Sequence, residues 1–441
     1  MNQASQLNTL LTYYDISTSA IGSASWWEEV NQIGMPCIKN QEDEDCLVLF
    51  IWRDPQGDEE HSETNDVILH VSGLTNHNTW DPTCLKRLNG SDVWFASLIV
   101  DAQWRGSYSY LPINVNQSPR LVKKVKGETK SAQRAWWLEI VKNQIPDYLN
   151  AHPIIASGWG MSSPLHLPNA PKELGWDEWD QGKLKQLPVN ESRYLDWYSE
   201  QLQIQRKCTL FSTANTDAPL VILLDGEKWE AKTGTLSVLQ HLTNTNDISP
   251  AHYLLIPSIN AATRWQELSC YRPFWNAVID ELLPQVKAYL IQSEILIDDY
   301  IIAGQSLGGL SALYAGAEFP DYFSKVITLS GSFWWPEIQR MQDADTFKLT
   351  NPDWQTIPPK NSLADLALNN LINIAHLSIY QTVGIAEQDL CVYNDIHQKA
   401  LEQKGATIFY DKVNGGHDWL SWRSALINGL IKLIPSKLAS R

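Results

Sequence analysis

Residues 300–318 place the tightest constraint on how this 441-residue chain can fold. They run from a short apolar stretch, typical of a buried strand, through Gly-Gln-Ser-Leu-Gly into small and apolar residues typical of a helix. A Gly-x-Ser-x-Gly turn in this context holds the serine in a strained conformation at the carboxyl end of a strand. We expect Gly304 and Gly308 to be required where a Cβ would collide with neighbouring backbone. The pattern predicts that Ser306 is a nucleophile at the carboxyl edge of an α/β sheet.

A serine hydroxyl is a weak nucleophile, so it needs a general base, and the base needs a carboxylate that orients it. In α/β-hydrolases the three groups follow along the chain as serine, acid and histidine. His417 is the best candidate for the base, because it follows two glycines in a loop after the last predicted strand. His397 falls inside a predicted helix, where we expect a solvated surface position.

The acid should lie on the loop that follows the preceding strand, at residues 384–389. This loop offers Glu387 and Asp389, and the residue pattern leaves both open. Asp418, directly after the candidate base, is more typical of a helix N-cap for the segment that begins at Trp419.

Two N–H groups should stabilise the oxyanion that forms when the serine attacks. Leu307, at the predicted helix start, would supply the first. The backbone around Gly226 and Glu227 follows an early buried strand and is the candidate for the second, because a glycine permits close approach. Asp225-Gly226 is also compatible with an ordinary tight turn.

Two arginines and many aromatic residues are candidates for ligand contacts. Arg264 lies after another strand end and could bind an anion, although pairing with Glu267 is the structural alternative. Arg105 lies in an aromatic stretch and could contact a ligand or stack on the aromatics of its own domain. The chain has 20 tryptophans, which fit large aromatic cores or a pocket for a flat aromatic ligand.

The length of the chain predicts two domains. Apolar runs at 46–53, 67–71 and 93–100 without intervening helices predict an all-β sandwich in the first part. Residues 151–186 show little periodicity, and we place the boundary there, giving domains 1–185 and 186–441. In the second part strands alternate with helices, which predicts an α/β domain with a mostly parallel sheet covered on both faces.

A formal net charge of −16, from 50 acidic and 34 basic side chains, argues against nucleic acid or an anionic membrane as a partner. We find no signal peptide and no apolar run long enough to insert into a membrane. The six scattered cysteines fit free thiols in a reducing compartment rather than disulfides or zinc ligands. We therefore expect a cytoplasmic protein.

Several motifs together resemble the enterochelin (ferric enterobactin) esterase family. They are Leu-Leu-Asp-Gly-x-x-Trp (223–229), Arg-x-x-Glu-Leu (264–268), Glu-Leu-Leu-Pro (281–284), Gly-Gln-Ser-Leu-Gly-Gly (304–309), Ser-Gly-Ser-Phe-Trp-Trp (330–335) and Gly-Gly-His-Asp-x-x-x-Trp-Arg (415–423). The first part is similar too, in residues 50–57, in Asp92-Val-Trp, and in Trp-Arg-Gly-Ser-Tyr (104–108) followed by Leu-Pro at 111–112. The similarity covers nearly the whole chain.

The resemblance implies a cytoplasmic hydrolase that cuts the esters of a tri-serine lactone siderophore carrying catecholates, and so releases iron. It implies an immunoglobulin-like β-sandwich before an α/β-hydrolase domain, with Ser306, His417 and Glu387 as the triad. Arg264 matches the family's substrate-facing arginine. A ferric tris-catecholate is anionic and has flat rings, so Trp229, Arg105, Trp104 and Tyr108 are further candidate contacts. No cofactor and no protein-bound metal is expected, since the iron arrives inside the substrate.

Two alternatives stay open. A carboxylesterase or acyltransferase of the same fold could act on another ester, such as a feruloyl ester. A protein that binds an iron siderophore and keeps an inactive triad is the non-enzymatic alternative. Release of aromatic acid from a feruloyl ester, with no action on siderophore lactones, would favour the first alternative, and tight binding of the siderophore without turnover would favour the second.

Overall fold

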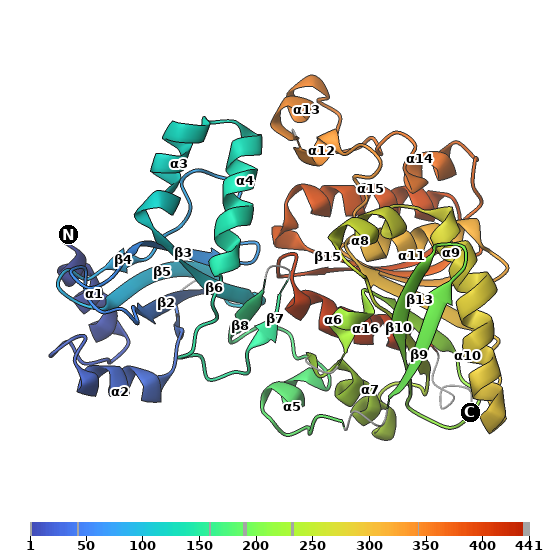
Figure 1. Cartoon of the computed structure of the whole chain (residues 1–441), viewed down its shortest axis with the longest axis horizontal. Helices are drawn as coiled ribbons and strands as arrows, with labels where there is room; N and C mark the ends of the chain where they lie inside the picture. The colour runs from blue at the N-terminus through green and yellow to red at the C-terminus, as the bar shows by residue number, and fades with distance from the viewer. Residues whose placement is uncertain are drawn as a thin grey trace. The chain divides into compact units, whose positions relative to one another are not determined.

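The computed structural model describes residues 2–41, 44–157, 160–187, 192–230, 233–342 and 344–434. Contacts divide the chain into two compact units; in Figure 1 most of unit 1 is blue to green, its short C-terminal segment is red, and unit 2 runs from green to red. Unit 1 comprises Met1–Lys172 together with Asn414–Leu420, and unit 2 comprises Glu173–Val413 together with Ser421–Arg441. Residues 173–185, predicted to belong to the first domain, therefore group with unit 2.

Unit 1 contains two antiparallel sheets of four strands each. The first has the order β1-β2-β5-β4, with bounds Cys37–Asn40, Asp45–Arg53, Val93–Asp101 and Lys86–Arg87. The second has the order β3-β6-β8-β7, with bounds Thr64–Val71, Arg105–Asn114, Met161–His166 and Ile155–Ala156. The helices of unit 1 are α1 (Gln3–Tyr13), α2 (Ala24–Ile33), α3 (Pro119–Lys126) and α4 (Lys130–Ile140).

Side chains of β2 alternate between two cores, as the period of a strand requires. Val48 and Phe50 point into a core shared with Val67 of β3 and Tyr108 of β6, so it joins the two sheets. The intervening Leu49 and Ile51 pack under α1 and α2. The strands predicted at 46–53, 67–71 and 93–100 are confirmed.

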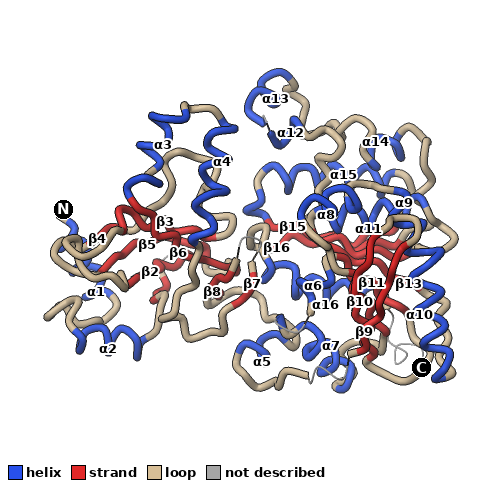
Figure 2. The backbone as a smooth tube through the Cα atoms, viewed as in Figure 1, coloured by secondary structure: helices blue, strands red, loops and turns tan. Residues whose placement is uncertain are grey.

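Unit 2 is built on one eight-stranded sheet, drawn in red in Figure 2. Its order is β16-β15-β14-β13-β11-β12-β10-β9, and the pairs from β16 to β12 are parallel, whereas β12-β10-β9 are antiparallel. The bounds in chain order are β9 Arg193–Ser199, β10 Ile204–Ser212, β11 Leu220–Leu224, β12 His252–Ile256, β13 Tyr300–Gln305, β14 Lys325–Leu329, β15 Ser378–Gly384 and β16 Thr407–Val413. The predicted mostly parallel sheet is confirmed.

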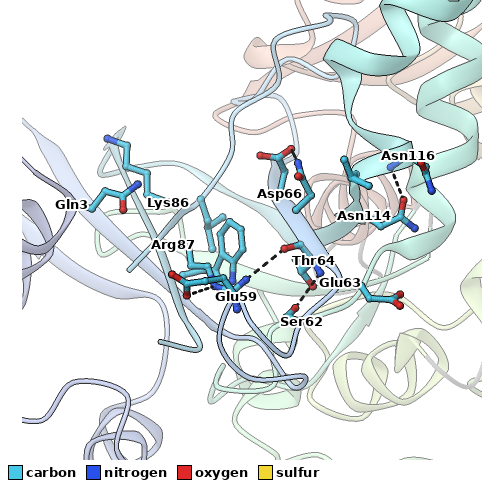
Figure 3. A pocket seen from close by; sticks show the side chains of 14 residues that line it. Gln3, Glu59, Ser62, Glu63, Thr64, Asp66, Lys86, Arg87, Asn114 and Asn116 are labelled. Carbon is cyan, nitrogen blue, oxygen red and sulfur yellow. Dashed lines mark hydrogen bonds and ion pairs between the residues drawn. The ribbon is translucent and has the colours of Figure 1, made fainter. Parts of the chain in front are cut away.

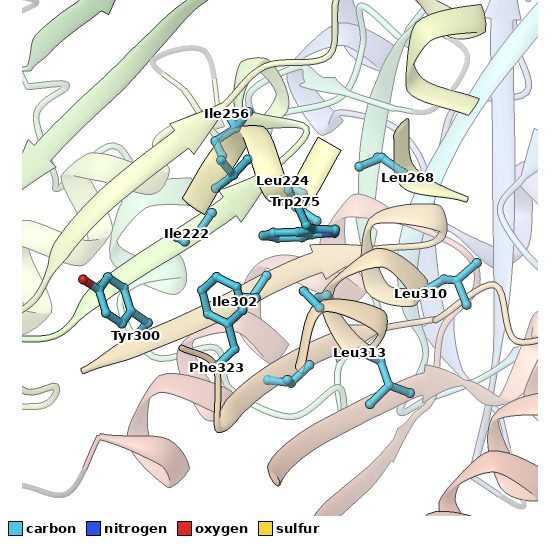
Figure 4. Close-up of a cluster of buried hydrophobic side chains, with 14 of the residues drawn as sticks. Ile222, Leu224, Ile256, Leu268, Trp275, Tyr300, Ile302, Leu310, Leu313 and Phe323 are labelled. Atoms are coloured by element: carbon cyan, nitrogen blue, oxygen red, sulfur yellow. The ribbon is translucent and has the colours of Figure 1, made fainter. Parts of the chain in front are cut away.

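Helices cover both faces of this sheet. Figure 4 shows one face, where Ile222 and Ile302 pack against Trp275 and Leu313 from the helices. On the other face, Gly429 lies against Ile327. The helices are α5 Trp176–Asp180, α6 Gly226–Trp229, α7 Thr235–Asn244, α8 Ala261–Leu268, α9 Arg272–Ala277, α10 Leu283–Leu290, α11 Leu307–Glu318, α12 Gln339–Gln342, α13 Ala344–Thr350, α14 Leu363–Leu368, α15 Asp389–Gln403 and α16 Trp419–Leu433.

A π-helical turn at Val278–Leu282 joins two of these helices, α9 and α10. Pro284 explains the turn, because it lacks an N–H and its ring would clash with the carbonyl one turn earlier in a regular α-helix.

None of the helices in the described part of the chain has the length and apolar character that crossing a bilayer requires. All six cysteines are unpaired.

Candidate active site

Ser306 occupies a strained turn between β13 and α11. Its φ and ψ of 56° and −119° are unusual for a residue with a side chain. Its N–H donates to Leu329 O (2.9 Å), its carbonyl accepts from Ser332 N (3.0 Å), and its Oγ lies 3.3 Å from Ser332 Oγ. The backbone bonds fix the turn from the neighbouring strand end, so the hydroxyl is presented at the carboxyl edge of the sheet.

The glycines around Ser306 differ in how much room they have. A Cβ at Gly304 would lie 2.4 Å from the backbone carbon of Gly308, and one at Gly309 would lie 2.6 Å from Thr328 Oγ1. A Cβ at Gly308 would meet nothing closer than 3.5 Å. The expectation that Gly304 must be glycine is confirmed, but the expectation for Gly308 is wrong, because its side-chain direction points into ordinary packing space.

The candidate oxyanion donors lie on neighbouring elements of the sheet. Strand β11 pairs with β13 in parallel, so Gly226 at the start of α6 and Leu307 at the start of α11 follow adjacent strand ends. Leu307 is the first residue of its helix, so its N–H has no partner within the helix. A Cβ at Gly226 would lie 2.6 Å from the backbone of Leu255, which shows why this turn needs a glycine. The exposed Glu227 carboxylate accepts from Ser258 N (2.8 Å).

Arg264 forms a two-point ion pair with Asp225, not with Glu267. Its Nε and Nη2 donate to the two Asp225 oxygens at 2.6 and 2.7 Å. Asp225 also accepts from Gln305 Nε2 (3.2 Å), next to the nucleophile. Glu267 instead pairs with Arg206 at 2.5 Å, so the predicted Arg264–Glu267 alternative is wrong. Desolvation lowers the pKa of Arg264, but the hydrogen bonds and charge of Asp225 outweigh it and the pKa is raised.

The two candidate acids have different partners. Glu387 lies in a short 3₁₀ turn after β15, and its Oε1 accepts from Gly384 N (2.7 Å) and Ser330 Oγ (2.6 Å). Asp389, at the start of α15, accepts from Lys348 Nζ (2.7 Å). Glu387 is thus held by the backbone at a strand end, whereas Asp389 is engaged in an ion pair.

His417 lies in the segment Asn414–Leu420, which groups with unit 1. Arg105 N donates to Asn414 O (3.0 Å), and a Cβ at Gly416 would lie 2.7 Å from Ser72 O. Asp418 Oδ1 accepts from Leu420 N (2.8 Å), which confirms the predicted N-cap of α16. Its Oδ2 accepts from both the N–H (3.1 Å) and the hydroxyl of Ser107, a buried contact that the sequence did not indicate.

His397 is fully buried, so the surface position predicted for it is wrong. Its ring stacks on Phe333 with centroids 4.3 Å apart, and burial lowers its pKa to about 3. An uncharged imidazole in the core has a packing role.

Three of the predicted substrate contacts are buried in the cores of their own units. Trp229 is fully buried, and its Nε1 donates to Leu224 O (3.1 Å) and Gln305 Oε1 (3.2 Å). Trp104 and Tyr108 belong to the core of unit 1, where the Tyr108 hydroxyl donates to Asp147 (2.7 Å). These three side chains have no surface to offer a ligand, so the prediction is wrong for them. Arg105 is half-buried, and its Nε donates to His166 Nδ1 (2.9 Å).

Ser330 and Trp422 were not singled out from the sequence. Ser330, with a φ of 50°, directly follows β14; its Oγ donates to Glu387 and accepts from Trp422 Nε1 (2.9 Å). Ser330 lies in the Ser-Gly-Ser-Phe-Trp-Trp motif at 330–335, and Trp422 lies in the Gly-Gly-His-Asp-x-x-x-Trp-Arg motif at 415–423. A polar residue directly after a parallel strand was the signal that could have identified Ser330.

A cavity of about 830 Å³ lies in unit 1 (Figure 3). Arg87 in its wall donates to Gly57 O (2.6 Å) and pairs with Asp54, so its charge is engaged within the loop structure. The cavity contains none of the predicted site residues.

Comparisons with known proteins cover nearly the whole chain. The family model described as "Enterochelin esterase, N-terminal" matches residues 47–176, and the one described as "Putative esterase" matches residues 199–433. The chain is 37% identical to the iron(III) enterobactin esterase of Dickeya dadantii (strain 3937), over 94% of this chain and 93% of the relative. A crystal structure of the enterobactin esterase from Shigella flexneri in the presence of enterobactin has a TM-score of 0.77 and 32% identity, covering 93% and 98% of the two chains. The same enzyme in the presence of 2,3-dihydroxy-N-benzoyl-serine gives 0.76 and 33%, with the same coverage.

Proposed function

Because the chain belongs to the enterochelin esterase family, we propose that it is a serine esterase that hydrolyses the ester bonds of ferric enterobactin or a closely related tri-serine lactone. The observation that carries this proposal is the strained Ser306 turn, which occurs in a chain that aligns with enterobactin esterases over 94% of its length. A strained serine at a strand end is the geometry that acyl transfer needs.

In this mechanism Ser306 Oγ attacks an ester carbonyl of the lactone while His417 accepts the hydroxyl proton. The N–H groups of Leu307 and of Gly226 or Glu227 stabilise the oxyanion. His417 then protonates the leaving seryl oxygen, which leaves an acyl group on Ser306. Water attacks this acyl-enzyme with His417 as its base, and Ser306 is regenerated.

Glu387 is the proposed orienting acid, in preference to Asp389. Its support is the position after β15 and the two hydrogen bonds that fix one oxygen. Arg264 is proposed to bind an anionic part of the substrate, since its side chain is about a quarter exposed beside the nucleophile turn. Arg105 stays a candidate contact from unit 1.

Two further assignments are proposals. Unit 1 is proposed to be an immunoglobulin-like sandwich, and its two antiparallel sheets with one shared core support this class. The protein is proposed to be cytoplasmic, and the six unpaired cysteines fit a reducing compartment.

The test is a product time course on ferric and iron-free enterobactin with wild-type protein and Ser306→Ala. We expect Ser306→Ala to lower kcat roughly ten-thousand-fold, since without the hydroxyl no acyl-enzyme forms. Ser293→Ala, at an exposed serine of unit 2, is the matched control and should keep full activity. Substantial lactone cleavage by Ser306→Ala would contradict the mechanism, and cleavage of feruloyl esters alone by the wild type would contradict the substrate.

A further inference from the structure

Unit 2 carries a cluster of three tryptophans beside the nucleophile turn. Trp265 lies on α8, and Trp334 and Trp335 follow β14. The Trp265 and Trp334 rings are stacked, with centroids 6.1 Å apart and an interplanar angle of 28°. Trp335 meets Trp265 edge-on at 5.9 Å. We call these residues the tryptophan cluster.

Two independent connections place the tryptophan cluster near Ser306. The first runs through Ser332, whose Oγ lies 3.3 Å from Ser306 Oγ and whose carbonyl accepts from Trp335 N (3.1 Å). The second runs through α8, which packs against α11, the helix that directly follows Ser306. Arg264, the residue before Trp265, is bonded to Asp225, and Asp225 is bonded to Gln305.

The cluster differs from the other aromatic groups of the candidate site in its exposure. Trp334 is buried, but Trp265 is 42% exposed. The buried Trp334 indole therefore supports the Trp265 indole, which keeps an exposed surface. Trp229, Trp104 and Tyr108 have no such surface. A rigid, supported and exposed indole is a suitable platform for a flat ring.

A cationic group accompanies this platform. Two nitrogens of Arg264 are used by Asp225, and Nη1 has no hydrogen-bond partner among the described residues. Asp225 is buried and fixes the direction of the guanidinium. Consecutive residues of α8 thus supply an exposed indole and a fixed, partly exposed guanidinium, a combination that suits an aromatic ring with an anionic oxygen.

We propose that the exposed face of Trp265 binds one aromatic ring of the substrate, with Arg264 Nη1 contacting an anionic oxygen on that ring. This inference rests on the proposed function, and it names the subsite that selects aryl substrates. Trp334 and Trp335 hold Trp265 in place. Cleavage of an ester that has no aryl group does not need the subsite.

Binding is measured by calorimetry with 2,3-dihydroxy-N-benzoyl-serine, which carries the aryl group and has no ester bond to be cleaved. Trp265→Ala should weaken binding about tenfold, the effect typical of losing one aromatic contact together with its buried area. Trp265→Phe should keep most of the affinity. Trp265→Leu, which preserves apolar volume without a large flat ring, should resemble Trp265→Ala and guards against a folding defect of the alanine variant.

Kinetics in the otherwise wild-type chain separate this proposal from the proposed function. Trp265→Ala should raise KM for ferric enterobactin about tenfold, with little change in kcat, and leave hydrolysis of ethyl butyrate unchanged. Tyr322→Ala is the matched control, because Tyr322 is 43% exposed in unit 2 and follows the far end of α11. It should change neither substrate.

Unchanged affinity and KM in Trp265→Ala, with normal turnover by the wild type, would overturn the aryl subsite and leave the esterase assignment standing. An equal loss on ethyl butyrate and ferric enterobactin would also overturn it, because the residue would then act on the turn itself. A wild-type protein that neither binds nor cleaves ferric enterobactin would overturn both proposals together.

Discussion

The segments that carry Ser306 and His417 are held by different means. The Ser306 turn is fixed from within unit 2, by hydrogen bonds to Leu329 and Ser332. The His417 segment groups with unit 1, where Arg105 bonds to Asn414 and Ser107 bonds to Asp418. Ser107 and Asp418 are 311 positions apart in the sequence. The proposed nucleophile is therefore supported within its own unit by the end of β14, and the segment of the proposed base is held by a residue from the first part of the chain.

This difference explains why the sequence predicts the Ser306 turn but does not identify the residue that supports the His417 segment. A strand, a strained serine and a helix form one continuous piece of chain, so the sequence motif predicts the turn. The glycines before His417 show that the backbone is unusual there, but they do not identify Ser107 as its support.

The largest effect is expected from substitution of Glu387, which, like Ser306, is held by contacts within unit 2. Glu387→Gln should lower kcat about a thousandfold, since an amide cannot stabilise the protonated base, while its oxygen can still accept from Ser330. Asp389→Asn loses a partly exposed ion pair with Lys348 and should change kcat by no more than about twofold. The measurement is kcat on ferric enterobactin, with circular dichroism to verify folding.

The opposite ranking would assign the acid role to Asp389 and place the support of the acid in α15 rather than in the turn after β15. Equal and small effects would mean that neither carboxylate orients the base.

Much of the fold could be predicted because it depends on local periodicity. The apolar stretch that begins residues 300–318 is a strand of the parallel sheet, and the resemblance to the enterochelin esterases is confirmed by the family models. The π-helical turn before Pro284 could not be predicted, since a proline in a helix can be accommodated in several ways.

The candidate site was predicted less completely, because a sequence does not reveal exposure. Trp229 and Trp265 are both tryptophans near strand ends, yet the first is fully buried and the second is 42% exposed. His397 was expected at the surface and lies in the core. The Arg264–Asp225 pair joins α8, which follows β12, to the residue directly after β11, and the parallel pairing of β11 with β12 brings the two together.

A matched pair of glycine substitutions tests the claim that the Ser306 turn requires the close backbone approach of Gly304 to Gly308. Gly304→Ala should destabilise unit 2 by about 3 kcal/mol, because the new Cβ meets backbone at 2.4 Å and neither segment can move easily. Gly308→Ala should change stability by less than about 1 kcal/mol, since its Cβ would make ordinary contacts and alanine favours the helix. Both are measured by thermal unfolding in a calorimeter. Similar effects of the two substitutions would show that the turn depends on more than this one close approach.

Ser107 tests the other half of the comparison, with the smallest expected effect. Ser107→Ala removes the hydroxyl bond to Asp418 and keeps the N–H bond, so the segment that carries His417 should loosen without unfolding. We expect kcat to fall about tenfold with KM nearly unchanged, and stability to fall by about 1–2 kcal/mol. Ser109→Ala is the control on the same strand, because Ser109 is fully buried and its Oγ has no hydrogen-bond partner within the described ranges. If both variants lose the same activity, strand β6 matters only for packing, and the proposed base does not depend on Ser107 for its position.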